Sequence, residues 1–137
     1  MNQKAVKIIA PLIMLAGALP TLLLMTYAGT MFRGGIISIL KSLLSLHSLL
    51  MMLWAISPFL YTWWATLKEQ NQPKRQITYL IVSIVLVCLA DYMYYGSVMM
   101  SADAQGALIF LFLPLYMNIA LGILKLVLIP FKKDSSA

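Results

Sequence analysis

Four long apolar stretches take up nearly all of the chain between Lys7 and Phe131, and only short polar segments separate them. Each stretch reaches the length of about 20 residues that a helix needs to cross the hydrocarbon layer of a membrane. The composition agrees, because 62% of the residues are hydrophobic and 10% are charged, whereas soluble domains carry roughly 25% charged residues. A soluble fold of this length could not bury so much apolar surface. The sequence therefore predicts an integral membrane protein.

The four stretches predict four transmembrane helices in a single domain that covers all 137 residues. Short connections favour neighbouring helices that run in opposite directions, so the expected fold is all-α, an antiparallel up-down bundle. In the first stretch, Ala16, Gly17 and Ala18 would let another helix approach closely. The expected helices cover approximately residues 8–32, 36–66, 77–100 and 107–131.

Basic residues gather on one side of this topology, while Arg33 and Lys41 fall on the other side. Cytoplasmic loops are the ones that carry an excess of lysine and arginine, so we expect both termini in the cytoplasm. The short loops favour a bacterial inner-membrane protein. Because the bases flank the apolar stretches and form no binding face, no nucleic-acid partner is expected. The bases on the cytoplasmic side are Lys4, Lys7, Lys68, Lys74, Arg75, Lys132 and Lys133.

Three charged residues interrupt the apolar stretches: Lys41, Asp91 and Lys125. A charge at the centre of a transmembrane helix costs about 2.5–3.5 kcal/mol on insertion scales, so each needs a partner or a route to water. Counting 1.5 Å per residue places Lys41 about 7–8 Å, and Asp91 about 13 Å, from the extracytoplasmic ends of their helices. These depths predict an ion pair between Lys41 and Asp91. In the alternative, Lys41 snorkels to the interface alone and Asp91 is bonded to tyrosines or lies at the interface.

Other polar residues recur around these charges at helical spacing. The second stretch carries a polar stripe at intervals of three and four residues, and Tyr94 and Tyr95 follow Asp91 by three and four residues. Such spacing places side chains on one face of a helix, so both tyrosines could donate hydrogen bonds to the Asp91 carboxylate. The two polar faces form either a satisfied seam between helices or the walls of a solvated cavity. The stripe of the second stretch consists of Ser38, Lys41, Ser45 and Ser48.

His47 is the only histidine and lies within the second expected helix, at mid-membrane depth. We expect it to form a hydrogen bond to a neighbouring helix, with Asn118 of the fourth stretch as the candidate partner. The alternative is a proton relay between His47 and Asp91, because imidazole titrates near physiological pH. Lys125 shares a helix face with Asn118 and is expected to snorkel to the cytoplasmic interface.

Motifs for catalysis and cofactor binding are sparse. Ser38 and Lys41 match the S-x-x-K pattern of serine–lysine enzymes, but the companion motifs S-D-N and K-T-G are missing from the sequence. The sequence contains no phosphate-binding glycine loop, and one histidine with one cysteine, Cys88, cannot build a conventional zinc site. We therefore expect neither an enzyme nor a cofactor or metal site.

The expected function is that of a non-enzymatic accessory, assembly or immunity-type protein that binds another membrane component. Its expected partners are the lipid bilayer and either another membrane protein or a second copy of the chain. The alternative is a small oligomeric transporter or channel that uses Asp91 with Lys41 or His47 as the coupling group. The sequence shows no internal repeat of the kind from which many secondary transporters are built.

Overall fold

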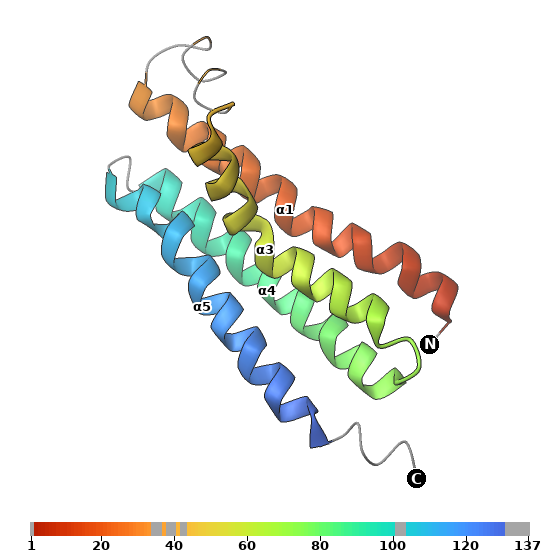
Figure 1. The fold of residues 1–137 in the computed structure, drawn as a ribbon. Helices are drawn as coiled ribbons and strands as arrows, with labels where there is room; N and C mark the ends of the chain where they lie inside the picture. The colour runs from red at the N-terminus through yellow and green to blue at the C-terminus, as the bar shows by residue number, and fades with distance from the viewer. Residues whose placement is uncertain (1, 34–36, 38–40, 42–43, 101–103, 131–137) are drawn as a thin grey trace.

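The computed structural model describes residues 2–33, 37, 41, 44–100 and 104–130. Within this part of the chain, four helices are long and apolar enough to cross a membrane, which indicates a multi-pass membrane protein (Figure 1). The helices are α1 (Gln3–Arg33), α3 (Leu46–Lys68), α4 (Pro73–Met100) and α5 (Ala104–Leu128).

The helices α3 and α4 form the centre of the bundle, and both contact α1 as well as α5. Figure 1 shows α1 and α5 on opposite flanks of this central pair. The core lies between the four helices and is made of aromatic and aliphatic side chains, together with small residues such as Ala28 and Ala90. The larger side chains at its centre are Phe59, Leu86, Tyr94, Phe110 and Met117.

The outer surface of the bundle is also apolar along each helix. Leu23 of α1 is 70% exposed and Leu126 of α5 is 67% exposed, and both central helices expose further isoleucine and leucine side chains. Contiguous apolar surface of this extent is rare on a soluble monomer. The surface is therefore the kind that lipid or another membrane protein covers.

The second long helix, α3, starts about ten residues later than the expected start at residue 36. α3 begins at Leu46, because Ser45 has extended backbone angles and its side chain accepts a hydrogen bond from the backbone N–H of Ser48. This is the geometry of an N-cap, which satisfies one of the free N–H groups of the first turn. Hydropathy does not detect this start, because the capping serine lies inside an apolar run.

Prolines lie inside three of the helices. At Pro58 of α3, a neighbouring side chain satisfies the backbone carbonyl group that the proline leaves without its usual donor. Pro58 has no N–H, so it cannot bond to the carbonyl oxygen of Trp54 one turn earlier. The Ser57 hydroxyl donates to this oxygen at 2.7 Å instead. The helix α3 thus continues through Pro58 without leaving an unsatisfied carbonyl group.

A polar network holds three helices together at the end of the bundle where α1 and α4 begin. The Gln76 amide of α4 donates to the Thr66 carbonyl oxygen of α3 at 3.1 Å and to the Gln3 amide oxygen of α1 at 3.2 Å. Gln3 in turn donates to Gln76 and to the Gln70 carbonyl oxygen. Beside it, Arg75 and Glu69 form an ion pair at 3.0 Å. We call this end of the molecule the Gln76 end.

Replacing Gln76 with leucine is expected to lower the free energy of unfolding by about 1–3 kcal/mol. Gln76 is 1% exposed, so its loss leaves Gln3 and the Thr66 carbonyl without the partners that the network provides. Thermal unfolding of the purified protein in a mild detergent measures the change. The matched control is Gln70→Leu, because the structure gives only the backbone oxygen of Gln70 a role in this network. Equal stability of the two variants would contradict the prediction.

Candidate functional site

The most unusual polar feature of the bundle is a pair of buried oxygen atoms on α4 that have no hydrogen-bond partner. They are Oδ1 of Asp91 and the hydroxyl oxygen of Tyr94. Native structures leave few buried polar atoms unsatisfied, and each exception calls for an explanation. The unsatisfied atom of Asp91 is the more costly of the two, because a charge within a transmembrane span is unfavourable unless another group compensates it.

Tyr94 is held in place by its ring. The side chain is fully buried and stacks on Phe110 of α5, with 4.7 Å between ring centroids and 9° between the ring planes. The expected hydrogen bond from Tyr94 to Asp91 is not formed, since both of these atoms lack a partner. The second expected donor, Tyr95, is 60% exposed and points away from the core.

The expected ion pair between Lys41 and Asp91 is not formed among the described residues. The ion pair that the structure describes joins Arg75 and Glu69, while Lys41 is exposed. The physical reason is the break at Ser45. Because α3 begins only at Leu46, Lys41 does not belong to this helix, and a depth counted along one continuous helix does not apply to it.

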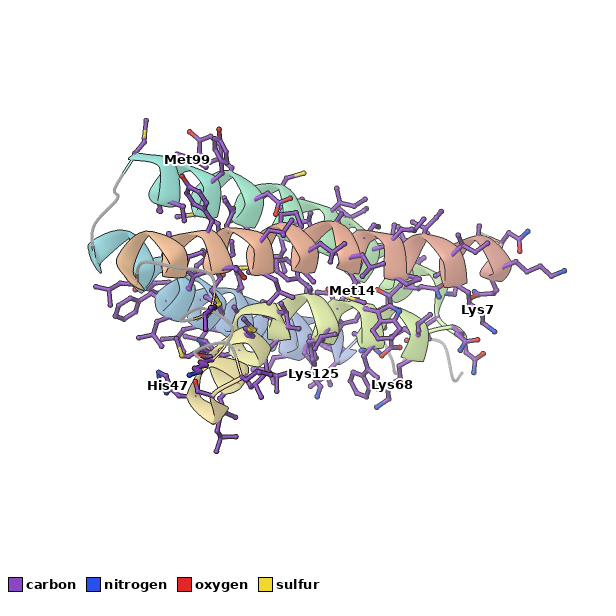
Figure 2. The ribbon with its side chains drawn as sticks, turned by 90° about the horizontal axis from the view of Figure 1, so that it is seen from above. Lys7, Met14, His47, Lys68, Met99 and Lys125 are labelled. Carbon is purple, nitrogen blue, oxygen red and sulfur yellow. The ribbon has the colours of Figure 1, made fainter. Side chains whose placement is uncertain are left out.

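The same break changes the role of the polar stripe in the second stretch. Ser45 is an N-cap, and its hydroxyl also donates to the Ser48 hydroxyl at 3.0 Å, so the stripe does not run along one helix. Ser38 lies outside the described residues. His47 is exposed in the first turn of α3, and Figure 2 shows it at the end of the bundle opposite Lys7 and Lys68. His47 therefore lies at the beginning of α3 and not in the middle of a long helix.

Asn118 pairs with a serine of α3 and not with His47. Its amide donates to the Ser57 hydroxyl at 2.9 Å, and the same hydroxyl donates to the Trp54 carbonyl that Pro58 leaves free. The Trp54 indole N–H donates across to the Leu111 carbonyl at 3.0 Å. This satisfied polar seam joins α3 to α5. Sequence reasoning missed it, although the Ser57–Pro58 pair within an apolar helix is a usable signal for it.

The surroundings of Asp91 and Tyr94 limit the chemistry that these two residues can carry out. No nucleophile or base is hydrogen-bonded to Asp91 in the described structure, so no catalytic pair is formed there. The described residues also contain no group of three or more histidine, cysteine or acidic side chains that could hold a metal ion. What the site offers is a carboxylate oxygen that can accept hydrogen bonds and a hydroxyl group that can accept or donate one.

The comparisons with known proteins give no further lead. No family model matches the chain, and no curated protein or solved structure matches it.

Proposed function

We propose that this chain is a multi-pass protein of the bacterial inner membrane, with an antiparallel helix bundle and both termini in the cytoplasm. In this proposal it acts without catalysis, as an accessory, assembly or immunity-type partner that binds another membrane protein. The single observation that carries the proposal is the unsatisfied carboxylate oxygen of Asp91 inside a span.

The orientation is supported by where the bases lie. Lys4, Lys7, Lys68 and Lys74 are exposed around the Gln76 end, and Figure 2 shows Lys7 and Lys68 at the same end of the molecule. An excess of lysine and arginine marks the cytoplasmic side of short-loop membrane proteins. Lys68 also lies 4.6 Å from the centroid of the Trp64 ring, and aromatic residues beside basic ones are typical of the membrane interface.

The binding role follows from the energetics of Asp91. Intramembrane acidic residues persist where they face a partner or water, because an uncompensated charge destabilises the inserted protein. The described part of the chain supplies no donor for Oδ1. The Asp91 side chain is only half-buried at the outer surface of the bundle. A component outside the chain can therefore reach its carboxylate group and donate to it, and such compensation favours association.

In-cell photo-crosslinking tests the proposal at two exposed positions. A photoreactive residue replaces Tyr95, which lies one helical turn beyond Asp91, or Ile123 on α5; both side chains are more than half exposed. We expect the probe at Tyr95 to form an adduct with one discrete membrane protein, and this adduct to be lost when Asp91→Asn is added. The probe at Ile123 is the control and should give no such adduct.

Two outcomes would contradict the proposal. Adducts that are the same with and without Asp91→Asn would remove Asp91 from partner binding. An adduct with a second copy of the chain would favour the oligomeric transporter or channel, for which the unpaired Asp91 is also a suitable coupling group. In that case Asp91→Asn should abolish proton or solute flux in reconstituted vesicles while the helical content stays unchanged.

A further inference from the structure

A stripe of exposed residues runs along α4 and contains Asp91. Successive members are separated by three or four residues, which places them on one face of the helix. This spacing is the pattern of a seam against which another helix packs. Asp91 is half-buried at the edge of the stripe, and the other members are exposed in the described structure. We call these residues the α4 stripe: Ile81, Ile84, Cys88, Asp91, Tyr95 and Met99.

The stripe is apolar except at Asp91. Ile81 and Ile84 occupy the half toward the Gln76 end, and Tyr95 and Met99 occupy the other half. Lipid can cover the apolar members, but it offers no hydrogen-bond donor to a carboxylate about 13 Å from the end of the helix at Met100. The occupant of the stripe therefore has to supply a polar group at one depth and an apolar surface on both sides of that depth.

The chemistry of the site selects a cation for that polar group. Asp91 when ionised can only accept hydrogen bonds, and the buried hydroxyl group of Tyr94 one turn away is also unpartnered. An ammonium group brings three donors and a guanidinium group brings five, and either one compensates the negative charge. A bound divalent metal is disfavoured, because the described residues place no second acidic, histidine or cysteine ligand in a group with Asp91.

We propose that the α4 stripe is the docking surface for a transmembrane helix of the partner, and that this helix carries a lysine or arginine at the depth of Asp91. The inference rests on the proposed function and specifies the chemistry of its partner. The apolar residues of the stripe supply the packing contacts, and the ion pair between the base and Asp91 sets the register.

Synthetic transmembrane peptides test this ion pair with the full-length protein in liposomes. The probe is a leucine-rich helix with a single lysine placed about 13 Å from its extracytoplasmic end, and energy transfer between labelled protein and labelled peptide reports association. We expect the lysine peptide to associate about ten-fold more tightly than the same peptide with leucine at that position. Asp91→Asn should remove the difference, and Ile119→Asn on the exposed face of α5 should leave it intact.

A second variant, in which the charges of the protein and the peptide are exchanged, tests the same ion pair without relying on Asp91→Asn. Asp91→Lys should associate more tightly with a peptide that carries aspartate at the same depth than with the lysine peptide. Equal association of the lysine and leucine peptides with the wild-type protein would overturn the proposal, and so would a preference for lysine that survives Asp91→Asn.

Oxidative crosslinking through Cys88 tests the competing occupant. Cys88 is the single cysteine of the chain and is an exposed member of the stripe. A Cys88–Cys88 dimer that forms with wild-type protein and is lost in Asp91→Asn would mean that a second copy covers the stripe, which overturns the proposal. If the peptides fail but the in-cell adduct at Tyr95 still depends on Asp91, the proposed function stands and only the basic partner helix is wrong.

Discussion

Replacing Tyr94 with alanine is expected to lower the free energy of unfolding by about 3 kcal/mol, in the range for removing a large buried aromatic side chain. Tyr94 is fully buried, and its ring stacks on Phe110 with a centroid separation of 4.7 Å. Its loss removes the stacking contact between α4 and α5 and leaves a cavity that the surrounding helices fill only in part. Unfolding of the purified protein in mixed detergent micelles, followed by helical circular dichroism, measures the change.

The control at the same position is Tyr94→Phe, which keeps the ring and removes only the hydroxyl group. Because this oxygen is buried without a partner, its removal should leave the stability unchanged or raise it. A large loss of stability in Tyr94→Phe would show that the hydroxyl is satisfied in the isolated protein.

The existence of the four helices could be predicted from the sequence, because transmembrane segments need long apolar runs and this chain has four. The close approach at Gly17 was also predictable, since small residues in a transmembrane helix let neighbouring helices come near. Three apolar stretches match the observed helices α1, α4 and α5 within a few residues. Hydropathy thus identifies which segments form long apolar helices, and it does so without any information on how these helices pack.

The start of α3 was not predictable by the same argument. A serine in an apolar run is compatible with a continuous helix, and only the extended backbone of Ser45 turns it into an N-cap. The predicted positions of Lys41 and His47 both depended on that continuous helix. The single N-cap at Ser45 therefore changed the expected positions of both residues.

The partners of the remaining polar residues were mostly not predictable either. Asp91 stands out in the sequence as a charge in an apolar stretch, but the sequence does not show that it lacks a partner. The pairing of Asn118 with Ser57 depends on how α3 and α5 face one another. Helical spacing orders the residues on one helix, whereas contacts between helices depend on rotations that one sequence does not determine.

Replacing Gly17 with alanine is expected to destabilise the bundle by about 1–3 kcal/mol, the usual cost of overpacking a core. A Cβ atom at Gly17 would lie 2.6 Å from Cδ1 and 2.7 Å from Cε1 of the Phe59 ring, and 2.9 Å from Cγ2 of Val87. Phe59 is 1% exposed, so its ring cannot move aside without displacing other core side chains. The substitution therefore pushes α1 away from both central helices at once.

Gly96 and Gly122 provide matched controls, because a Cβ atom at either position meets nothing within 4 Å. Alanine forms helices better than glycine by up to about 1 kcal/mol, so Gly96→Ala and Gly122→Ala should leave the stability unchanged or raise it. The same substitution is thus destabilising where helices pack closely and neutral or stabilising where the added Cβ meets open space. Thermal unfolding of the three variants in one detergent compares them directly. If Gly17→Ala also raised the stability, α1 could not be packed against Phe59 and Val87 at the distance that the structure gives.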